Sequence, residues 1–317
     1  MSYLNIPSLD LNNFLSKDKT KKYEFVKKLG EAYEQVGFLS LKNYGLDSSI
    51  ENELYEEVYR FFALPKEIKD KYEKPELNGQ RGYISFGKEK AKGFKKSDLK
   101  EFWHFGQELH KDDPLNNEYE PNIFCEELPN FNTIGRKVFS ILEKTGISIL
   151  QALALHLNLP EHYFDAKVKG GNSILRAIHY PPITTEPKGA VRAAAHGDIN
   201  LITILMGASA AGLEVQARNG QWISVTALPN QVVVNIGDML SRFTNDKLHS
   251  SIHQVTNPPK SEWSKPRFSI PFFMHPRSEM SLNCLDSCIN EQNPKKYEDI
   301  TAGAFLEERI KELGLKK

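Results

Sequence analysis

A histidine and an aspartate stand two residues apart in His196-Gly197-Asp198. In an extended strand, residues i and i+2 face the same side, so this imidazole and this carboxylate can converge on one point. Both groups bind divalent transition metals. Because such triplets also occur in polar turns, a third ligand is needed to define a metal site.

Two downstream histidines, His249 and His253, are the candidates for that third ligand. Their spacing would suit a zinc pair on a helix, but Ser250 stands where zinc proteases carry a glutamate. The sequence around His253 is typical of a strand, so we assign His253 as the ligand and His249 as a polar neighbour. Two histidines and one carboxylate with open positions opposite form the facial triad of non-haem Fe(II) oxygenases.

A second pattern that could bind an anion follows 14 residues after His253. Arg267 and Ser269 alternate in a run of strand-forming residues, so they share a face with Phe273. A guanidinium beside a hydroxyl can hold a carboxylate, such as the distal one of a keto-diacid that chelates a metal with its other end. The alternative is an arginine paired with a structural acid.

The elements that must position these residues form two groups along the 317-residue chain. Helical periodicity predicts helices over residues 22–35, 48–63, 132–157 and 302–315. After residue 170, short β-forming runs alternate with turn signals, as in 173–180, 200–206, 231–236, 251–255 and 267–273. This pattern predicts an α+β protein with a mainly β core, a double-sheet jelly roll with helices packed outside. We expect a mixed N-terminal region, 1–125, that does not fold alone, and a catalytic core, 126–317.

The composition excludes several classes of function. Forty-one Lys and Arg balance 41 Asp and Glu, so nothing favours a nucleic-acid or membrane-surface partner. Mean hydropathy is −0.47, no apolar run approaches the roughly 20 residues of a membrane span, and no signal peptide is visible. Three cysteines, Cys125, Cys284 and Cys288, indicate a reducing compartment. We therefore expect a cytoplasmic protein.

The ordered set of motifs resembles the isopenicillin N synthase-like family of iron(II)- and 2-oxoglutarate-dependent dioxygenases. The matching pieces in the core include Leu175-Arg-Ala-Ile-His-Tyr-Pro-Pro182, His196-Gly-Asp198, Val233-Val-Asn-Ile-Gly-Asp238, Ser250-Ser-Ile-His253 and Arg267-Phe-Ser269. The N-terminal part resembles the same family in Asn43-Tyr-Gly45 and Phe61-Phe-Ala-Leu-Pro65, among others. The resemblance therefore covers nearly the whole chain.

This resemblance implies a double-stranded β-helix with Fe(II), 2-oxoglutarate and O₂ as cofactor and cosubstrates. It implies His196, Asp198 and His253 as iron ligands, Arg267 and Ser269 as the 2-oxoglutarate clamp, and Tyr180 as a donor to the same cosubstrate. The sequence departs from the family at Gly197, at Gln254 and at Ile178, which replaces a common asparagine. The implied reaction is oxidation, chiefly hydroxylation, with release of succinate and CO₂.

The implied partner is a small-molecule substrate, with no nucleic acid or membrane, in a monomer or weak homo-oligomer. If two of the three candidate arginines line the pocket, the substrate is expected to be anionic. The candidate substrate-contacting residues are Arg81, Tyr83, Phe102, His104, Arg176, Ile178, Arg192 and Phe273.

Three questions stay open from the sequence. One alternative is an iron oxidase of the same family that does not use 2-oxoglutarate, of the oxidative cyclase type. Another is a non-catalytic jelly roll that binds a ligand. The glycine- and lysine-rich residues 74–98 are expected to form a loop, and the lysine run 88–100 is expected to be solvated. Whether residues 74–104 form a lid is the third question.

Overall fold

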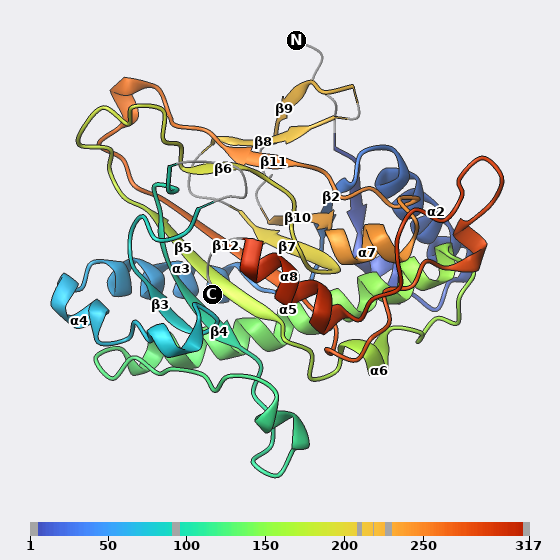
Figure 1. The fold of residues 1–317 in the computed structure, drawn as a ribbon, viewed down its shortest axis with the longest axis horizontal. Helices are drawn as coiled ribbons and strands as arrows, with labels where there is room; N and C mark the ends of the chain where they lie inside the picture. The colour runs from blue at the N-terminus through green and yellow to red at the C-terminus, as the bar shows by residue number, and fades with distance from the viewer. Residues whose placement is uncertain (1–5, 91–95, 208–210, 218, 226–229, 313–317) are drawn as a thin grey trace.

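Two facing β-sheets form the centre of the computed structural model, which describes residues 6–90, 96–207, 211–217, 219–225 and 230–312. The larger sheet has eight strands in the spatial order β1-β2-β10-β7-β12-β5-β4-β3, and the smaller has four in the order β6-β11-β8-β9 (Figure 1). The larger sheet contains β1 (Ser8–Asp10), β2 (Phe38–Lys42), β3 (Gly82–Ile84), β4 (Glu101–Gly106), β5 (Ile174–Tyr180), β7 (Ile202–Met206), β10 (Gln231–Ile236) and β12 (Arg267–Met274). The smaller contains β6 (Ala193–His196), β8 (Leu213–Gln216), β9 (Trp222–Ser224) and β11 (His253–Val255).

Helices cover the outer face of the larger sheet, and α5 runs along it (Figure 1). Helix α5 packs on β4, β5, β7 and β12, and also on α2 and α3. The helices are α1 (Leu11–Leu15), α2 (Lys19–Gln35), α3 (Ser48–Phe62), α4 (Lys66–Asp70), α5 (Pro129–His156), α6 (Asp165–Val168), α7 (Asp238–Phe243) and α8 (Ala302–Glu312). This architecture is the predicted α+β double-stranded β-helix with helices outside.

Strand β12 shows how one sequence serves both faces of the larger sheet. Phe268, Ile270 and Phe272 belong to the core between the sheet and the helices. Arg267, Ser269 and Phe273 alternate with them and therefore face the smaller sheet. A second apolar cluster, which includes Tyr180 and Val215, fills the space between the two sheets. The predicted alternation along residues 267–273 is thus confirmed.

Helix α5 is long and apolar enough to span a membrane by length and composition alone, contrary to the expectation that no apolar run is that long. More than half of its most apolar window is buried inside the protein, where Ile134, Val138, Leu142 and Leu153 join the helix-side core. Packing against the sheet therefore accounts for the apolarity of this helix.

Candidate active site

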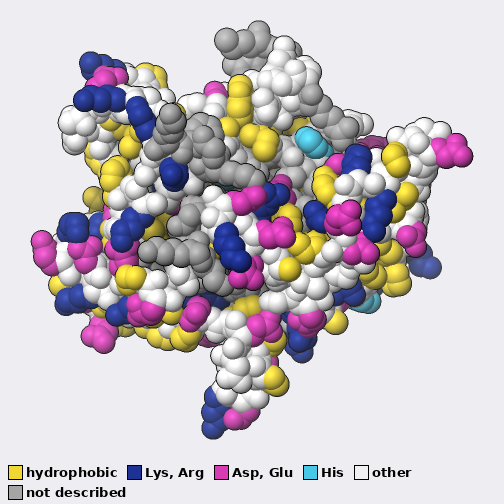
Figure 2. Space-filling model, in the orientation of Figure 1, with side chains coloured by type: hydrophobic (Ala, Val, Ile, Leu, Met, Phe, Trp, Pro, Cys, Tyr) yellow, Lys and Arg dark blue, Asp and Glu magenta, His cyan; other side chains and the backbone are white. Residues whose placement is uncertain are grey.

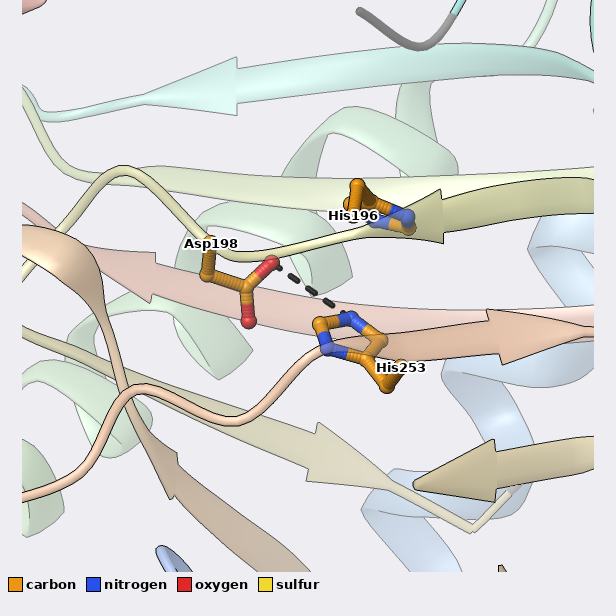
Figure 3. A group of neighbouring side chains, drawn as sticks. All are labelled: His196, Asp198 and His253. Carbon is orange, nitrogen blue, oxygen red and sulfur yellow. Dashed lines mark ion pairs between the residues drawn. The ribbon is translucent and has the colours of Figure 1, made fainter. Parts of the chain in front are cut away.

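His196, Asp198 and His253 come together between the two sheets (Figure 3). His196 ends β6 and His253 begins β11, and the two residues are register partners in the antiparallel pair. One ligand atom from each of the three side chains lies within 4.8 Å of the other two. His253 Nε2 lies 3.7 Å from Asp198 Oδ1. The three metal-ligating side chains therefore converge on one point, as the spacing in the sequence predicts.

Hydrogen bonds to backbone carbonyls orient both imidazoles. His196 Nδ1 lies 2.6 Å from the carbonyl oxygen of Ala194, and His253 Nδ1 lies 3.3 Å from that of Ser251. A carbonyl can only accept, so Nδ1 carries the proton in each ring and Nε2 keeps its lone pair for a metal. Burial, with the nearby His253, lowers the pKa of His196 to about 4, so this ring is neutral near pH 7.

The carboxylate of Asp198 is held through one oxygen only. Oδ2 accepts hydrogen bonds from Thr203 Oγ1 at 2.6 Å and from Asn235 Nδ2 at 2.7 Å, while Oδ1 faces His253. Burial alone would raise the pKa of Asp198, but the two histidines and these two donors lower it below its usual value. The site therefore presents one anionic oxygen and two neutral nitrogens, a donor set that fits Fe(II).

Thr203 and Asn235 are functional residues that the sequence reasoning missed. Thr203 is the single polar residue of Ile202–Met206, and Asn235 is the one polar residue that follows Gln231 in the otherwise apolar run Gln231–Ile236. Both are almost fully buried. A lone polar residue in a buried strand needs a hydrogen-bond partner, and this was the available signal that both face a polar site.

The predicted carboxylate clamp lies on β12, next to β5 of the same sheet. Arg267 is register partner of Tyr180, and Ser269 is partner of Ile178. Arg267 is 1% exposed, and its guanidinium carbon lies 5.0 Å from the centre of the Tyr180 ring. The structure therefore brings Arg267, Ser269 and Tyr180 together in the space between the sheets.

A cavity of about 370 Å³ opens beside the three converging donors, with His196 and Asp198 at its wall. Four of the predicted substrate-contacting residues line it: Phe102, His104, Arg176 and Phe273. They come from β4, β5 and β12, adjacent strands whose inward faces meet here. This volume is near the lower end of the range for small-molecule sites, so a compact ligand fits.

The other four candidates do not line this cavity. Arg81 is buried and donates to Gln107 and Asn172, and Tyr83 lies in the helix-side core with its hydroxyl on Glu101. Ile178 belongs to the apolar cluster between the sheets. Arg192 donates to the carbonyl oxygen of Lys265, 3.2 Å away, and its guanidinium lies 5.9 Å from the Tyr180 ring. Only one of the three candidate arginines, Arg176, therefore lines the cavity.

The lysine-rich segment is only partly the solvated segment expected from the sequence, because Lys88, Lys90 and Lys96 are exposed whereas other charged residues of the segment face inward. Glu89, Asp98 and Lys100 line the cavity, and Lys100 Nζ lies 2.7 Å from Glu89 and 2.8 Å from Asp98. Residues 91–95 lie outside the described part of the chain. Charged residues can be buried when each has an oppositely charged partner, and such partners cannot be identified from the spacing of residues in the sequence. Helix α8 adds Leu306, Arg309 and Ile310 to the lining.

Two family models match the chain. Residues 6–127 match the N-terminal part described as "non-haem dioxygenase in morphine synthesis", and residues 171–276 match the 2OG-Fe(II) oxygenase superfamily. A proline hydroxylase of Petromyces alliaceus is 32% identical, with 97% of this chain and 99% of that protein covered. A 2-oxoglutarate-Fe(II) type oxidoreductase of Emericella nidulans is 30% identical, with 94% and 89% covered.

Solved structures agree in fold with this chain. A 2OG-Fe(II) oxygenase family protein from Caulobacter crescentus is 40% identical, with a TM-score of 0.88 over 98% of this chain and 99% of that one. A Neurospora crassa protein in complex with alpha-KG (2-oxoglutarate) and thymine is 33% identical, with a TM-score of 0.84 over 96% of each chain. With its His-Asp-His group between two sheets, the chain belongs to the 2OG-Fe(II) oxygenase family and is a 2-oxoglutarate-dependent non-haem iron dioxygenase that uses Fe(II), 2-oxoglutarate and O₂.

Proposed function

We propose that His196, Asp198 and His253 hold the iron of this dioxygenase. The observation that carries the proposal is the convergence of their three ligand atoms within 4.8 Å, beside the cavity whose wall includes His196 and Asp198. When bound, Fe(II) supplies the activation of O₂ that is coupled to decarboxylation of 2-oxoglutarate and oxidation of the substrate. The protein supplies three ligands on one side and leaves the opposite side open.

The surrounding residues keep these ligands ready. Ala194 and Ser251 fix the two imidazoles through their Nδ1 protons, and Thr203 and Asn235 occupy the outer oxygen of Asp198. Such outer contacts set ligand orientation and basicity, and their loss typically weakens metal binding by about 10- to 100-fold.

Arg267 and Ser269 are proposed to bind the distal carboxylate of 2-oxoglutarate, with Tyr180 beside them. Both clamp residues are almost fully buried, on the inward face of β12 that Phe273 shares. A buried guanidinium that can hold a carboxylate with two parallel hydrogen bonds gives both charge pairing and direction. The clamp would hold one end of 2-oxoglutarate while its keto-acid end faces the iron ligands.

The substrate is proposed to be a small molecule that is hydroxylated in the cavity of about 370 Å³. The similar proteins named above include a proline hydroxylase and a protein solved with thymine. Proline and thymine are both compact ring compounds. Phe102, His104, Arg176 and Phe273 are the side chains proposed to contact the substrate. A cytoplasmic location is proposed because Cys125, Cys284 and Cys288 are buried free thiols, as expected in a reducing compartment. A monomer or weak homo-oligomer is proposed as well.

Succinate formation from 2-oxoglutarate tests the proposed ligand assignment. Iron-loaded protein under O₂ should release succinate slowly without substrate, and His196→Ala should reduce this release by at least about 100-fold. His249→Ala is the matched control, because His249 lies four residues from His253 and outside the converging group. Its rate should stay within about twofold of the parent protein. Equal loss in both variants, or no loss in His196→Ala, would contradict the assignment.

A further inference from the structure

Four charged side chains near the proposed iron ligands form a continuous series of ion pairs along the cavity wall. Arg176 Nη1 lies 3.3 Å from both carboxylate oxygens of Glu89. Lys100 Nζ bridges Glu89, at 2.7 Å, and Asp98, at 2.8 Å. The outer oxygen of Asp98 accepts from the backbone N–H of Ala194 at 3.0 Å. Two cations and two anions therefore cancel, and each has its partner.

Glu89 and Lys100 stabilise each other's charged forms. Burial alone would raise the pKa of Glu89, but Arg176 and Lys100 hold it well below its usual range. Burial alone would lower the pKa of Lys100, but Glu89 and Asp98 raise it above its usual value. This part of the cavity wall is thus strongly polar, and the charges of its four linked side chains sum to zero.

Arg176 keeps one donor for a ligand. Its Nε donates to His104 Nε2 at 2.6 Å, and Nη1 is taken by Glu89. His104 Nδ1 lies 2.9 Å from the carbonyl oxygen of Gly79, so Nε2 is the acceptor and the ring is neutral. Nη2 makes no hydrogen bond to any residue in the part of the chain that the structure describes, and Arg176 lines the cavity.

Two aromatic rings flank this guanidinium. Its central carbon lies 4.2 Å from the centre of the Phe102 ring and 5.2 Å from that of Phe273. Both rings line the same cavity as Arg176, so apolar ring faces lie beside its polar groups. A flat ring can pack against aromatic side chains that line a cavity, and an oxygen on its edge could accept from Nη2.

We propose that the substrate is an uncharged small ring compound whose carbonyl or amide oxygen accepts a hydrogen bond from Arg176, in place of the anionic substrate expected from the sequence. The inference rests on the proposed function of the same site. A carboxylate brought to this wall would lose its hydration and gain little, because the charge of Arg176 is already neutralised by Glu89. A neutral acceptor satisfies the donor at much lower desolvation cost.

Matched pairs of probes test this inference by calorimetry under nitrogen, with protein loaded with Fe(II) and 2-oxoglutarate. Uracil pairs with orotate, its carboxylate, and 2-pyrrolidinone pairs with 5-oxoproline. At least one neutral probe should bind at least about tenfold more tightly than its acid partner, about 1.4 kcal/mol. Tighter binding of the acids, or binding by neither neutral probe, would overturn the inference.

Glu89→Gln gives an independent reading of the same idea. Removal of the compensating carboxylate leaves a net positive wall, so the ratio of acid to neutral affinity should rise by at least about tenfold. Glu73→Gln is the control, since Glu73 pairs with Lys88 and does not line the cavity. An unchanged ratio in a folded Glu89→Gln protein would contradict the inference, and the wild-type probe series decides alone if that variant does not fold.

The two proposals fail in different ways. The visible absorption of the Fe(II)·2-oxoglutarate chelate is recorded in the same samples before probes are added. If this absorption is missing, the ligand assignment fails. If it is present and the acids bind better, only the inference about substrate charge fails.

Discussion

The two carboxylate oxygens of Asp198 have different roles in the structure. Oδ2 is fully occupied by Thr203 and Asn235, whereas Oδ1 points toward His253. A carboxylate held in this way offers a single oxygen in a fixed direction, which suits a three-ligand site with open positions. The charge of the aspartate and the neutral state of His196 both favour metal binding without a change of protonation.

The clamp gives a prediction at the residue scale. Arg267→Lys keeps the charge but loses the planar fork, so the KM for 2-oxoglutarate should rise by roughly 10- to 100-fold, equivalent to the roughly 1.5–3 kcal/mol of a hydrogen bond to a charged group. Ser269→Ala removes one neutral donor and should raise KM by less than about tenfold. Steady-state succinate formation measures both values. A Ser269→Ala effect larger than that of Arg267→Lys would contradict the assigned roles.

Glu89 gives a prediction about pH. Its pKa in the folded protein lies well below the usual value of about 4.3, so its charged form stabilises the fold above that pH. This contribution is lost as pH falls through the folded-state pKa. Wild-type protein should therefore be more stable than Glu89→Gln at pH 7, and the difference should shrink below about pH 4. Urea titrations at several pH values measure it, and a pH-independent difference would contradict the prediction.

Spacing predicted the converging His-Asp-His group but not which of the candidate substrate-contacting residues reach the cavity. His196 and Asp198 stand two residues apart, and the sequence around His253 is typical of a strand, but the antiparallel pair that brings His253 to His196 appears only in the structure. Arg81 and Arg192 are both buried, yet neither lines the cavity, because their donors reach Gln107, Asn172 and Lys265 instead. Such pairings depend on distant residues, which no local pattern specifies.

At the scale of elements, the long helices and most strands of the C-terminal half were predicted, whereas β3, β4 and β6 were not. The helix expected at 132–157 is α5, Pro129–His156, and the strand expected at 173–180 is β5, Ile174–Tyr180. Strand β3 has only three residues within a segment expected to be a loop, and it forms because β4 pairs with it. A three-residue strand has no period of its own, so tertiary pairing decides it.

The contact between α5 and β4 gives a prediction at this scale. A Cβ atom on Gly135 would lie 2.4 Å from the ring of Phe105. Alanine favours a helix by about 1 kcal/mol over glycine, but overpacking costs about 1–3 kcal/mol, so Gly135→Ala should be destabilising or at best neutral. Ser140→Ala on the exposed face of α5 is the control and should be neutral or slightly stabilising. Denaturant unfolding compares them, and a clear gain for Gly135→Ala would contradict this packing.

At the scale of the whole molecule, both halves of the chain build the same sheet. Strand β2 pairs with β10, and β4 pairs with β5, so N-terminal strands lie at both edges of the larger sheet and flank the C-terminal strands. The helix-side core likewise joins residues from Phe14 to Phe305. Positive and negative side chains are interspersed over the face drawn in Figure 2, in keeping with a net charge of zero.

This architecture predicts that residues 126–317 do not fold alone. Removal of 1–125 would leave β5 and β10 as long unpaired edges and expose the apolar face of α5. The fragment should be aggregated or lack a cooperative unfolding transition in circular dichroism. Co-expression of 1–125 with 126–317 is the complementary test and should recover soluble, metal-binding protein. A fragment that folds cooperatively by itself would contradict the expected dependence.

The central claim is that His196, Asp198 and His253 bind the iron to which 2-oxoglutarate chelates. Anaerobic addition of Fe(II) and then 2-oxoglutarate to the full chain, followed by visible absorption, tests it most directly. The chelate should give a charge-transfer band in the wild-type protein and in His249→Ala, and no band in His196→Ala or His253→Ala. A band of equal strength in His196→Ala, or none in the wild-type protein, would contradict the claim.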